Sequence, residues 1–400
     1  MASTTAYDHV HLLVIGGGPA GHSAVAGYRD DDGPGRVLLV SDDQAQPYNR
    51  PPLSKDYLRG ETDEAELWLD GRGYYEEHDI ELWLDDPVVS LDAGARVART
   101  ASGRSVAYEQ CVLATGCRPA VLPIPGGGHP DVLQLRFLDQ AQELRGRAER
   151  AASAVVVGSG FIGCEAAMSL ALRGLAVTMV SSEPLPQRHR LGQAAAERIA
   201  TWLADAGVHL IGDAHVAAIE DGRAVHLEDG RSVTADLVLT AVGVDPQTQL
   251  AADAGCTLDG DRVVVDEHLA TGIPGLFAAG DIAFARNATA GRHLAVEHWG
   301  EATIMGEIAG ENAAGATEAW GDVPGFWSEI GPHTLKYGAW GDGWDRDVLV
   351  EHPDGGWTVW YTRDQDGQQV TVGVLTSEAD ADYDHGCELV AAGAPLPALG

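Results

Sequence analysis

The chain has 400 residues, 45% apolar and 22% charged, so it is long enough for two or three globular domains and too apolar to be disordered. Its 26 Lys and Arg residues stand against 60 Asp and Glu residues, and the formal net charge of −34 disfavours nucleic acid and anionic membranes as partners. No uncharged apolar run reaches the roughly 18 residues of a membrane span, and no basic signal-peptide region is present, so we expect a cytoplasmic protein. Composition does not distinguish a monomer from a homodimer.

Residues 9–43 predict a strand, a tight turn, a helix and a second strand, in that order. The turn carries the three glycines of a G-x-G-x-x-G pattern, namely Gly16, Gly18 and Gly21. Glycines let the backbone approach a pyrophosphate, and the helix that follows presents unpaired N–H groups to it. The segment therefore predicts a dinucleotide site, in which Asp42 or Asp43 would accept a hydrogen bond from a ribose hydroxyl.

The same arrangement returns at residues 154–180, with glycines at Gly158, Gly160 and Gly163. With 50 glycines in 400 residues, a G-x-G-x-x-G pattern is expected by chance about once in the chain. A single copy is therefore weak evidence for a dinucleotide site. Two copies, each between an apolar strand and a helix, indicate two Rossmann-like units.

Six of the ten tryptophans follow residue 319, in a region with stretches of alternating apolar and polar residues. Alternation of this kind is typical of antiparallel strands. The sequence thus predicts an α/β fold with two Rossmann-like dinucleotide-binding domains and a C-terminal α+β domain.

The five cysteines show neither Cys-x-x-Cys spacing nor a Cys/His set that would bind a metal. We therefore expect no metal site, and we expect the cysteines to be small buried apolar residues. They are Cys111, Cys117, Cys164, Cys256 and Cys387.

Three segments in the first part of the chain resemble one family. Residues 16–21 (GGGPAG), 47–58 (PYNRPPLSKDYL) and 114–119 (ATGCRP) resemble the FAD half of the ferredoxin reductases that serve Rieske dioxygenases and bacterial cytochromes P450, relatives of apoptosis-inducing factor. The order of motifs continues to match downstream. Residues 158–165 (GSGFIGCE) are similar to the NAD(P)H site of that family, and residues 276–281 (LFAAGD) to its second FAD signature.

The resemblance implies a domain order. An FAD-binding domain would comprise residues 1–116 and 245–319, with an NAD(P)H-binding domain inserted at residues 117–244. A C-terminal α+β interface domain would follow at residues 320–400.

The resemblance also implies that Lys55 pairs with Glu165 beside the flavin ring, where the hydride arrives. The chemistry is reasonable, because a cation near the flavin stabilises charge on the reduced ring and a buried lysine requires a carboxylate partner. Lys55 is one of only two lysines in the chain. Asp281 would lie at a helix N-terminus near the ribityl or phosphate groups of FAD, and Trp299 and Trp327 would pack around the ring.

The catalytic residues expected from this resemblance are Lys55 and Glu165. Residues 296–299 (VEHW) resemble the flavin-side loop of that family, and His298 within them is expected to be structural, since no nucleophile or acid is placed with it. The full set of candidate cofactor-binding residues is Gly16, Gly18, Pro19, Ala20, Gly21, Asp42, Asp43, Arg50, Lys55, Ala114, Thr115, Gly116, Arg118, Gly158, Gly160, Phe161, Ile162, Gly163, Glu165, Ser181, Ser182, Arg188, Gly243, Gly280, Asp281, Glu297, His298, Trp299 and Trp327.

The choice between NADH and NADPH stays open. NADH-using enzymes usually place an acid directly after the second strand of the nucleotide unit, and this chain has Ser181, Ser182 and then Glu183 there. Arg188 and Arg190 follow and suit a 2′-phosphate, whereas the third glycine of the turn favours NADH. We expect some use of both nucleotides.

The expected function is transfer of electrons from NAD(P)H through FAD to a ferredoxin-type acceptor. The segment 47–60 lacks the cysteine pair of the disulfide reductases, which argues against a dithiol relay. The alternatives are an NAD(P)H oxidase or quinone reductase on the same scaffold, and a signalling flavoprotein similar to apoptosis-inducing factor. Because ferredoxins are commonly acidic, either the arginines of this chain gather on one docking face or the acceptor is neutral, basic or small.

Overall fold

The computed structural model describes residues 8–71 and 73–396, which divide into two compact units. The first unit contains the chain up to Asn49, Trp68–Arg118 and Pro246–Pro324. The second contains Arg50–Leu67, Pro119–Asp245 and the chain from Gly325 onward.

The two units divide the chain differently from the three expected domains. The chain passes between units at 118/119 and 245/246, near the expected boundaries at 116/117 and 244/245. Residues 50–67, which the expected FAD domain includes, cluster with the second unit, and so does the chain from residue 325. Both additions pack on the same helix, α5 (Phe161–Leu172), which explains why they cluster with it.

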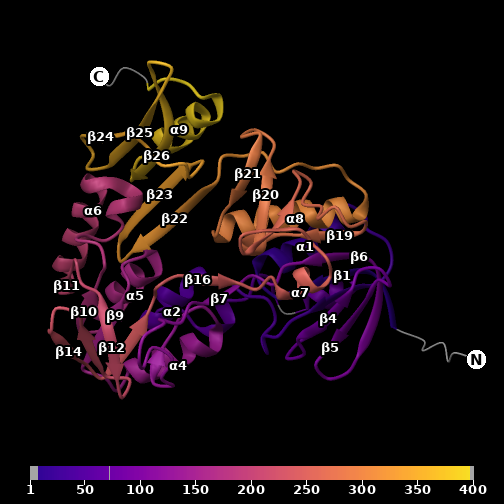
Figure 1. The fold of residues 1–400 in the computed structure, drawn as a ribbon, viewed down its shortest axis with the longest axis horizontal. Coiled ribbons are helices and arrows are strands. Elements are labelled where there is room, and N and C mark those ends of the chain that lie inside the picture. The colour runs from indigo at the N-terminus through magenta and orange to yellow at the C-terminus, as the bar shows by residue number, and fades with distance from the viewer. Residues whose placement is uncertain (1–7, 72, 397–400) are drawn as a thin grey trace, which may run out of the picture. The chain divides into compact units, whose positions relative to one another are not determined.

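The first unit is built on a seven-stranded sheet with the order β3-β2-β1-β6-β5-β4, in which β19 also pairs with β6 (Figure 1). The five strands β1, β2, β3, β6 and β19 are parallel, and β4 and β5 extend the sheet as an antiparallel pair. Their bounds are β1 (Asp8–Ile15), β2 (Val37–Val40), β3 (Ile80–Trp83), β4 (Val88–Asp92), β5 (Val97–Thr100), β6 (Ser105–Leu113) and β19 (Leu276–Ala278). Apolar side chains of the parallel strands form the core of the unit.

Two helices of the first unit, α1 (Pro19–Asp30) and α8 (Trp299–Ala314), pack closely on each other. Glycines allow the approach: a Cβ at Gly306 would lie 2.2 Å from the Ala20 carbonyl oxygen, and one at Gly310 would lie 2.1 Å from that of Ala24. The first unit also contains α3 (Tyr74–Glu77), α7 (Gln249–Asp253), η3 (Gly280–Ile282) and a four-stranded sheet of β17 (Leu258–Asp259), β18 (Arg262–Val265), β20 (Ala283–Asn287) and β21 (Arg292–Ala295). Strands β7 (Cys117–Pro119) and β16 (Val244–Pro246) form a separate two-stranded sheet.

The second unit contains a parallel sheet with the order β11-β10-β9-β15-β8. Its strands are β8 (Val132–Leu133), β9 (Ser153–Val157), β10 (Ala176–Val180), β11 (His209–Ile211) and β15 (Leu237–Thr240). Besides α5, the helical elements are η1 (Pro51–Ser54), α2 (Asp56–Arg59), η2 (Glu64–Glu66), α4 (Leu138–Ala148) and α6 (Arg188–Asp205). A small antiparallel sheet consists of β12 (Val216–Glu220), β13 (Ala224–Leu227) and β14 (Ser232–Thr234).

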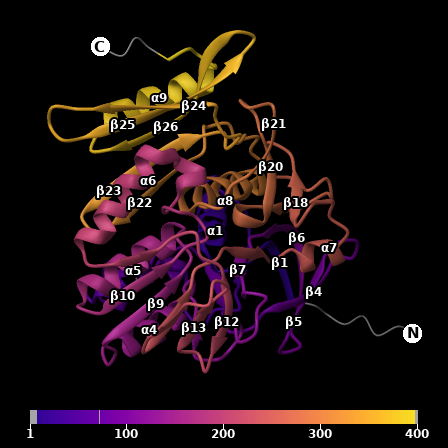
Figure 2. The ribbon, with the colours of Figure 1, turned by 60° about the vertical axis from the view of Figure 1, so that its left-hand side comes forward.

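The C-terminal part of the second unit is a five-stranded antiparallel sheet with the order β22-β23-β26-β25-β24. Its strands are β22 (Gly325–Ile330), β23 (His333–Ala339), β24 (Arg346–Glu351), β25 (Trp357–Gln365) and β26 (Gln368–Ser377). Helix α9 (Asp380–Ala392) packs along β26 and β23 (Figure 2). Strand β22 contacts α5, so this sheet reaches the helix that follows the second glycine-rich turn.

The expected fold class is confirmed. Both strand–turn–helix–strand segments form as the glycine patterns predict, and the tryptophan-rich end is an antiparallel α+β structure. Four of the five cysteines are buried and Cys387 is half-buried, and all five are free thiols. Among the helices that the structure describes, none is both long enough and apolar enough to cross a membrane.

Gly310→Val tests the close packing of α1 on α8. Its side chain would meet the backbone of Ala24, so the free energy of unfolding should fall by about 2 kcal/mol. Gly146→Ala in α4 is the control, because a Cβ there meets no atom within 4 Å; it should leave stability unchanged or raise it by about 1 kcal/mol. Urea unfolding followed by circular dichroism measures both, and equal midpoints for wild type and Gly310→Val would contradict the packing.

Candidate active site

The first glycine-rich turn joins β1 to α1. Gly16 has φ of 122°, and a Cβ there would lie 2.1 Å from the Ala114 carbonyl oxygen. A Cβ at Gly21 would lie 1.9 Å from the Gly16 carbonyl oxygen, so a side chain at either position would break the turn. In the described structure no side chain caps the N-terminus of α1 at Gly18, and buried Pro19 and Ala20 open the helix. This terminus therefore suits a phosphate group.

The second turn repeats this geometry between β9 and α5. Gly158 has φ of 108°, and a Cβ there would lie 2.2 Å from the Ala241 carbonyl oxygen. A Cβ at Gly163 would lie 2.3 Å from the Gly158 carbonyl oxygen. Gly160 precedes α5 with no capping side chain in the described chain, and Ile162 in the first helical turn is 39% exposed.

The two acids after β2 have different surroundings. Both carboxylate oxygens of Asp43 are used inside the loop, because one accepts the Ala45 N–H and the other accepts the Tyr48 hydroxyl at 2.8 Å. Asp42 is exposed and pairs through one oxygen with Arg118 at 2.8 Å. Asp42 is therefore the better placed of the two to accept a ribose hydroxyl.

Other candidate residues of the first unit lie on connecting turns. Ala114 is buried, the Thr115 hydroxyl donates to the Gln247 carbonyl at 2.6 Å, and Gly116 has φ of 61°. In the second unit, Gly243 has φ of 110°, and a side chain there would meet no described atom within 4 Å.

Asp281 lies beside Gly280 in the first turn of η3, so the helix whose N-terminus was expected there is a short 3-10 helix. The chain enters β20 directly after this turn, so no longer helix begins there. Arg262 donates to the Asp281 carbonyl and to the Glu297 carboxylate, and it thereby joins two candidate residues that are far apart in the sequence. Sequence reasoning missed Arg262, since no motif marks it.

His298 is the residue that precedes α8, and Trp299 is the first residue of that helix. In the second unit Trp327 lies on β22 and is 38% exposed. Arg50 holds its guanidinium 5.2 Å from the ring centre of Phe137. Phe161 packs on Phe326 with ring centres 4.6 Å apart.

The structure brings Lys55 and Glu165 together as a buried ion pair. Lys55 Nζ lies 3.0 Å from Glu165 Oε2, and the two residues are 6% and 5% exposed. Lys55 follows η1 and Glu165 lies in the second turn of α5. The hydroxyl groups of Ser54 and Ser328 donate to the same carboxylate, and neither serine was expected at the site.

One N–H of Lys55 is left for a ligand. Nζ donates to the Pro51 carbonyl at 3.0 Å and to Glu165, and its third N–H has no acceptor among the described residues. Burying two charges costs free energy that their attraction only partly returns, so an apolar pair of similar size would serve stability equally well. The pair is therefore better explained by chemistry than by folding.

The residues after β10 were expected to distinguish NADPH from NADH, and the structure shows which of them are accessible. Ser181 is 1% exposed, and its hydroxyl lies 2.7 Å from that of Ser159 and accepts the Glu183 N–H. It is therefore not accessible to a 2′-phosphate. Ser182, Arg188 and Arg190 are exposed.

Glu183 lies beside the start of α6, where its carboxylate accepts the His189 N–H at 2.8 Å. Its side chain is 24% exposed, so its negative charge reaches the surface next to Ser182. A 2′-phosphate bound there would meet this charge.

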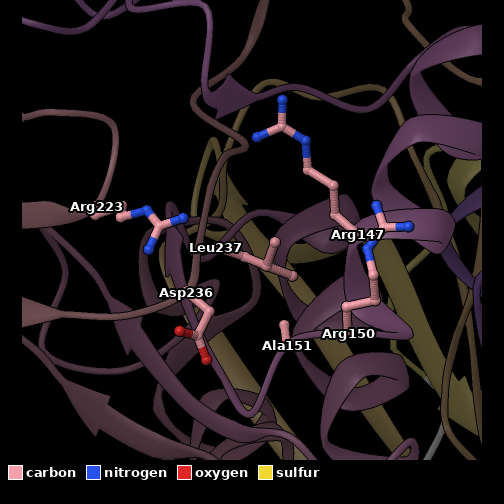
Figure 3. A pocket seen from close by; sticks show the side chains of 6 residues that line it. All are labelled: Arg147, Arg150, Ala151, Arg223, Asp236 and Leu237. Carbon is pink, nitrogen blue, oxygen red and sulfur yellow. The ribbon is translucent and has the colours of Figure 1, made fainter.

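A pocket of about 270 Å³ lies at the N-terminal ends of β9 and β15 in the parallel sheet of the second unit (Figure 3). Arginine side chains stand on two sides of it, with Asp236 below Arg223 in this view. The lining residues are Arg147, Arg150, Ala151, Arg223, Asp236 and Leu237. Since the glycine-rich turn follows the other end of β9, this pocket is not part of the expected nucleotide site.

Three residues lie close enough together to hold a metal ion, although the spacing of cysteines and histidines in the sequence predicted no metal site. His9, His11 and Glu109 have ligand atoms within 4.8 Å of one another, because β1 and β6 pair side by side there. Nδ1 of His11 accepts the Arg36 N–H at 3.2 Å, so in the neutral ring the proton is on Nε2. That nitrogen faces Glu109 and lacks the lone pair that a metal needs.

Comparison with known proteins identifies the family. The model of the family described as pyridine nucleotide-disulphide oxidoreductase matches residues 10–306. The chain is 33% identical over 349 residues to rhodocoxin reductase of Rhodococcus erythropolis, covering 86% of this chain and 82% of the relative. It is 32% identical over 329 residues to rubredoxin-NAD(+) reductase of Pseudomonas putida, covering 81% and 85%.

A solved structure supports the same assignment. The ferredoxin reductase for the CYP199A2 system from Rhodopseudomonas palustris matches with a TM-score of 0.90 and 29% identity, over 97% of this chain and 96% of that one. The chain has two glycine-rich turns and two Rossmann-like sheets. It belongs to the pyridine nucleotide-disulphide oxidoreductase family and is an oxidoreductase.

Proposed function

We propose that the chain is an FAD flavoprotein that takes electrons from NADH and passes them to a ferredoxin-type iron–sulfur protein. The observation that carries the proposal is the buried ion pair of Lys55 and Glu165, whose charged atoms lie 3.0 Å apart; Glu165 belongs to α5, the helix that follows the second glycine-rich turn, and Lys55 follows η1. A cytoplasmic location, expected from the sequence, belongs to the same proposal.

The first unit would hold FAD by the turn from Gly16 to Gly21 and by Asp42. The free N-terminus of α1 supports this, because it offers unpaired N–H groups to a pyrophosphate. The second unit would hold the nicotinamide nucleotide by the turn from Gly158 to Gly163, which has the same geometry at α5.

Each charged residue of the pair has a distinct task in this proposal. Glu165 keeps the Lys55 ammonium oriented inside the protein, and the spare N–H of Lys55 would bind the flavin ring. FAD, when bound, supplies a two-electron acceptor for hydride and a one-electron donor for an iron–sulfur cluster. Burial keeps water away from the two charged side chains themselves, which strengthens their interaction.

The thiols of this chain are not suited to a dithiol relay. Burial raises the pKa values of the Cys111 and Cys164 thiols well above their ordinary value, so they stay protonated and unreactive. No cysteine lies in the segment 47–60. Electrons would therefore leave the flavin for a separate acceptor, and the names of the compared reductases, which refer to rhodocoxin, rubredoxin and ferredoxin, support a small electron-transfer protein.

Lys55→Met is expected to leave FAD bound and to slow flavin reduction by NADH about 100-fold, because it removes a cation from the reacting centre. Glu165→Gln should slow the same step. Since the two residues work as a unit, the double variant should be little slower than the slower single variant. Stopped-flow absorbance of the flavin measures all three, and additive losses would argue against a shared role.

The charge of Glu183 is expected to favour NADH. Glu183→Gln keeps an acceptor for the His189 N–H and removes the charge, so the ratio of kcat/KM for NADPH to that for NADH should rise about tenfold. Arg188→Ala and Arg190→Ala serve as comparisons. A ratio that falls in either arginine variant and is unchanged in Glu183→Gln would mean that the arginines, and not the acid, set the preference.

The acceptor can be identified by direct comparison. With NADH as donor, a [2Fe–2S] ferredoxin should be reduced faster than a small quinone or oxygen. If a local basic surface steers docking against the net charge of −34, this rate should fall as salt rises from about 10 to 300 mM. A rate independent of salt, together with faster reduction of the quinone, would favour a quinone reductase.

A further inference from the structure

The Glu165 carboxylate is held by two serines from different parts of the second unit. Ser54 Oγ donates to Oε2 at 2.6 Å, and Ser328 Oγ donates to Oε1 at 2.6 Å. Ser54 and Ser328 are 5% and 1% exposed, so water does not compete for these bonds. We call the two side chains the serine clamp.

The clamp uses separate elements of the fold. Ser54 ends η1 and is the neighbour of Lys55 in the chain. Its own carbonyl accepts the Ser169 hydroxyl of α5 at 2.7 Å, which fixes η1 to the helix that carries Glu165. Ser328 comes from β22 of the C-terminal sheet, 163 residues along the chain from Glu165.

The clamp fixes the orientation of the carboxylate plane relative to the lysine. Hydrogen bonds from hydroxyl groups to a carboxylate are charge-assisted and directional, and here each oxygen has its own donor. Rotating the carboxylate would break the bond to Ser328 and leave a buried oxygen without a donor. With Oε1 on Ser328, Oε2 points to Lys55 Nζ at 3.0 Å and leaves the third N–H of Lys55 for the ligand.

We propose that Ser54 and Ser328 are positioning residues that act through Glu165 to aim the Lys55 ammonium, so that the C-terminal sheet completes the active site. The proposal rests on the proposed function for the step that it affects. It also assigns the sheet a role beyond that of an interface domain, because β22 supplies a side chain to the buried network.

Ser328→Ala and Ser54→Ala test the clamp in the FAD-loaded protein. Each should slow flavin reduction by NADH about tenfold, equivalent to about 1.4 kcal/mol, with FAD still bound. Ser377→Ala is the matched control: Ser377 is a buried serine of the same sheet, and the described structure gives its hydroxyl no hydrogen bond. In Ser377→Ala, NADH should reduce the flavin at the wild-type rate.

The Glu165→Gln background separates positioning from general stability. Ser328 acts through the carboxylate in this account, so Ser328→Ala should change the rate by less than about twofold once Glu165 is Gln. Ser328→Thr keeps the hydroxyl and should recover most of the wild-type rate. If Ser328→Ala does not fold, Ser54→Ala in both backgrounds gives the same comparison.

A second readout does not depend on the reaction. Urea unfolding of the FAD-free chain should show that Ser328→Ala and Glu165→Gln are non-additive, whereas Ser377→Ala and Glu165→Gln should be additive. If wild-type protein binds FAD but NADH does not reduce the flavin, the proposed function is wrong. The unfolding measurements on the single and double variants would still test the serine clamp in that case. Equal rates of flavin reduction in Ser328→Ala and Ser377→Ala would overturn the proposal. So would equal slowing by Ser328→Ala in the wild-type and Glu165→Gln backgrounds.

Discussion

The burial of one ion pair constrains the arrangement of the whole second unit. Lys55 and Glu165 are almost completely removed from water, and such a pair is tolerated only if its remaining hydrogen-bonding groups are satisfied. The carboxylate accepts the Ser54 hydroxyl from η1 and the Ser328 hydroxyl from β22, and the Lys55 ammonium donates to the Pro51 carbonyl, with one N–H left for a ligand. This explains why residues 50–67 and the C-terminal sheet cluster with the second Rossmann-like sheet.

The position of Glu165 on α5 would connect the proposed nucleotide turn to the Lys55 ammonium. Gly160 precedes the helix and Glu165 lies five residues further on, a rise of about 7.5 Å along a helix axis. The same rigid element therefore presents N–H groups for a phosphate at its start and a carboxylate in its second turn. Movement of the helix would shift both together, which suits a site where hydride transfer depends on the position of the donor.

Local patterns in the sequence were sufficient for the fold. The glycine patterns and apolar runs predicted both strand–turn–helix–strand segments, and alternation around the late tryptophans predicted the antiparallel sheet. The resemblance to ferredoxin reductases pointed to Lys55 and Glu165. Features that depend on side-chain direction could not be predicted: Ser328 reaches Glu165 only through the packing of β22, Ser181 turns inward to Ser159, and both oxygens of Asp43 are used in its own loop.

Anaerobic titration of the purified FAD-loaded protein with NADH tests the central claim most directly, because it isolates hydride transfer from any choice of acceptor. We expect one equivalent of NADH to bleach the oxidised-flavin absorption band completely in the wild type. In Lys55→Met the same end point should be reached much more slowly, with FAD retained. A wild-type protein that retains FAD and shows no bleaching with excess NADH would contradict the assignment of the buried pair to hydride transfer.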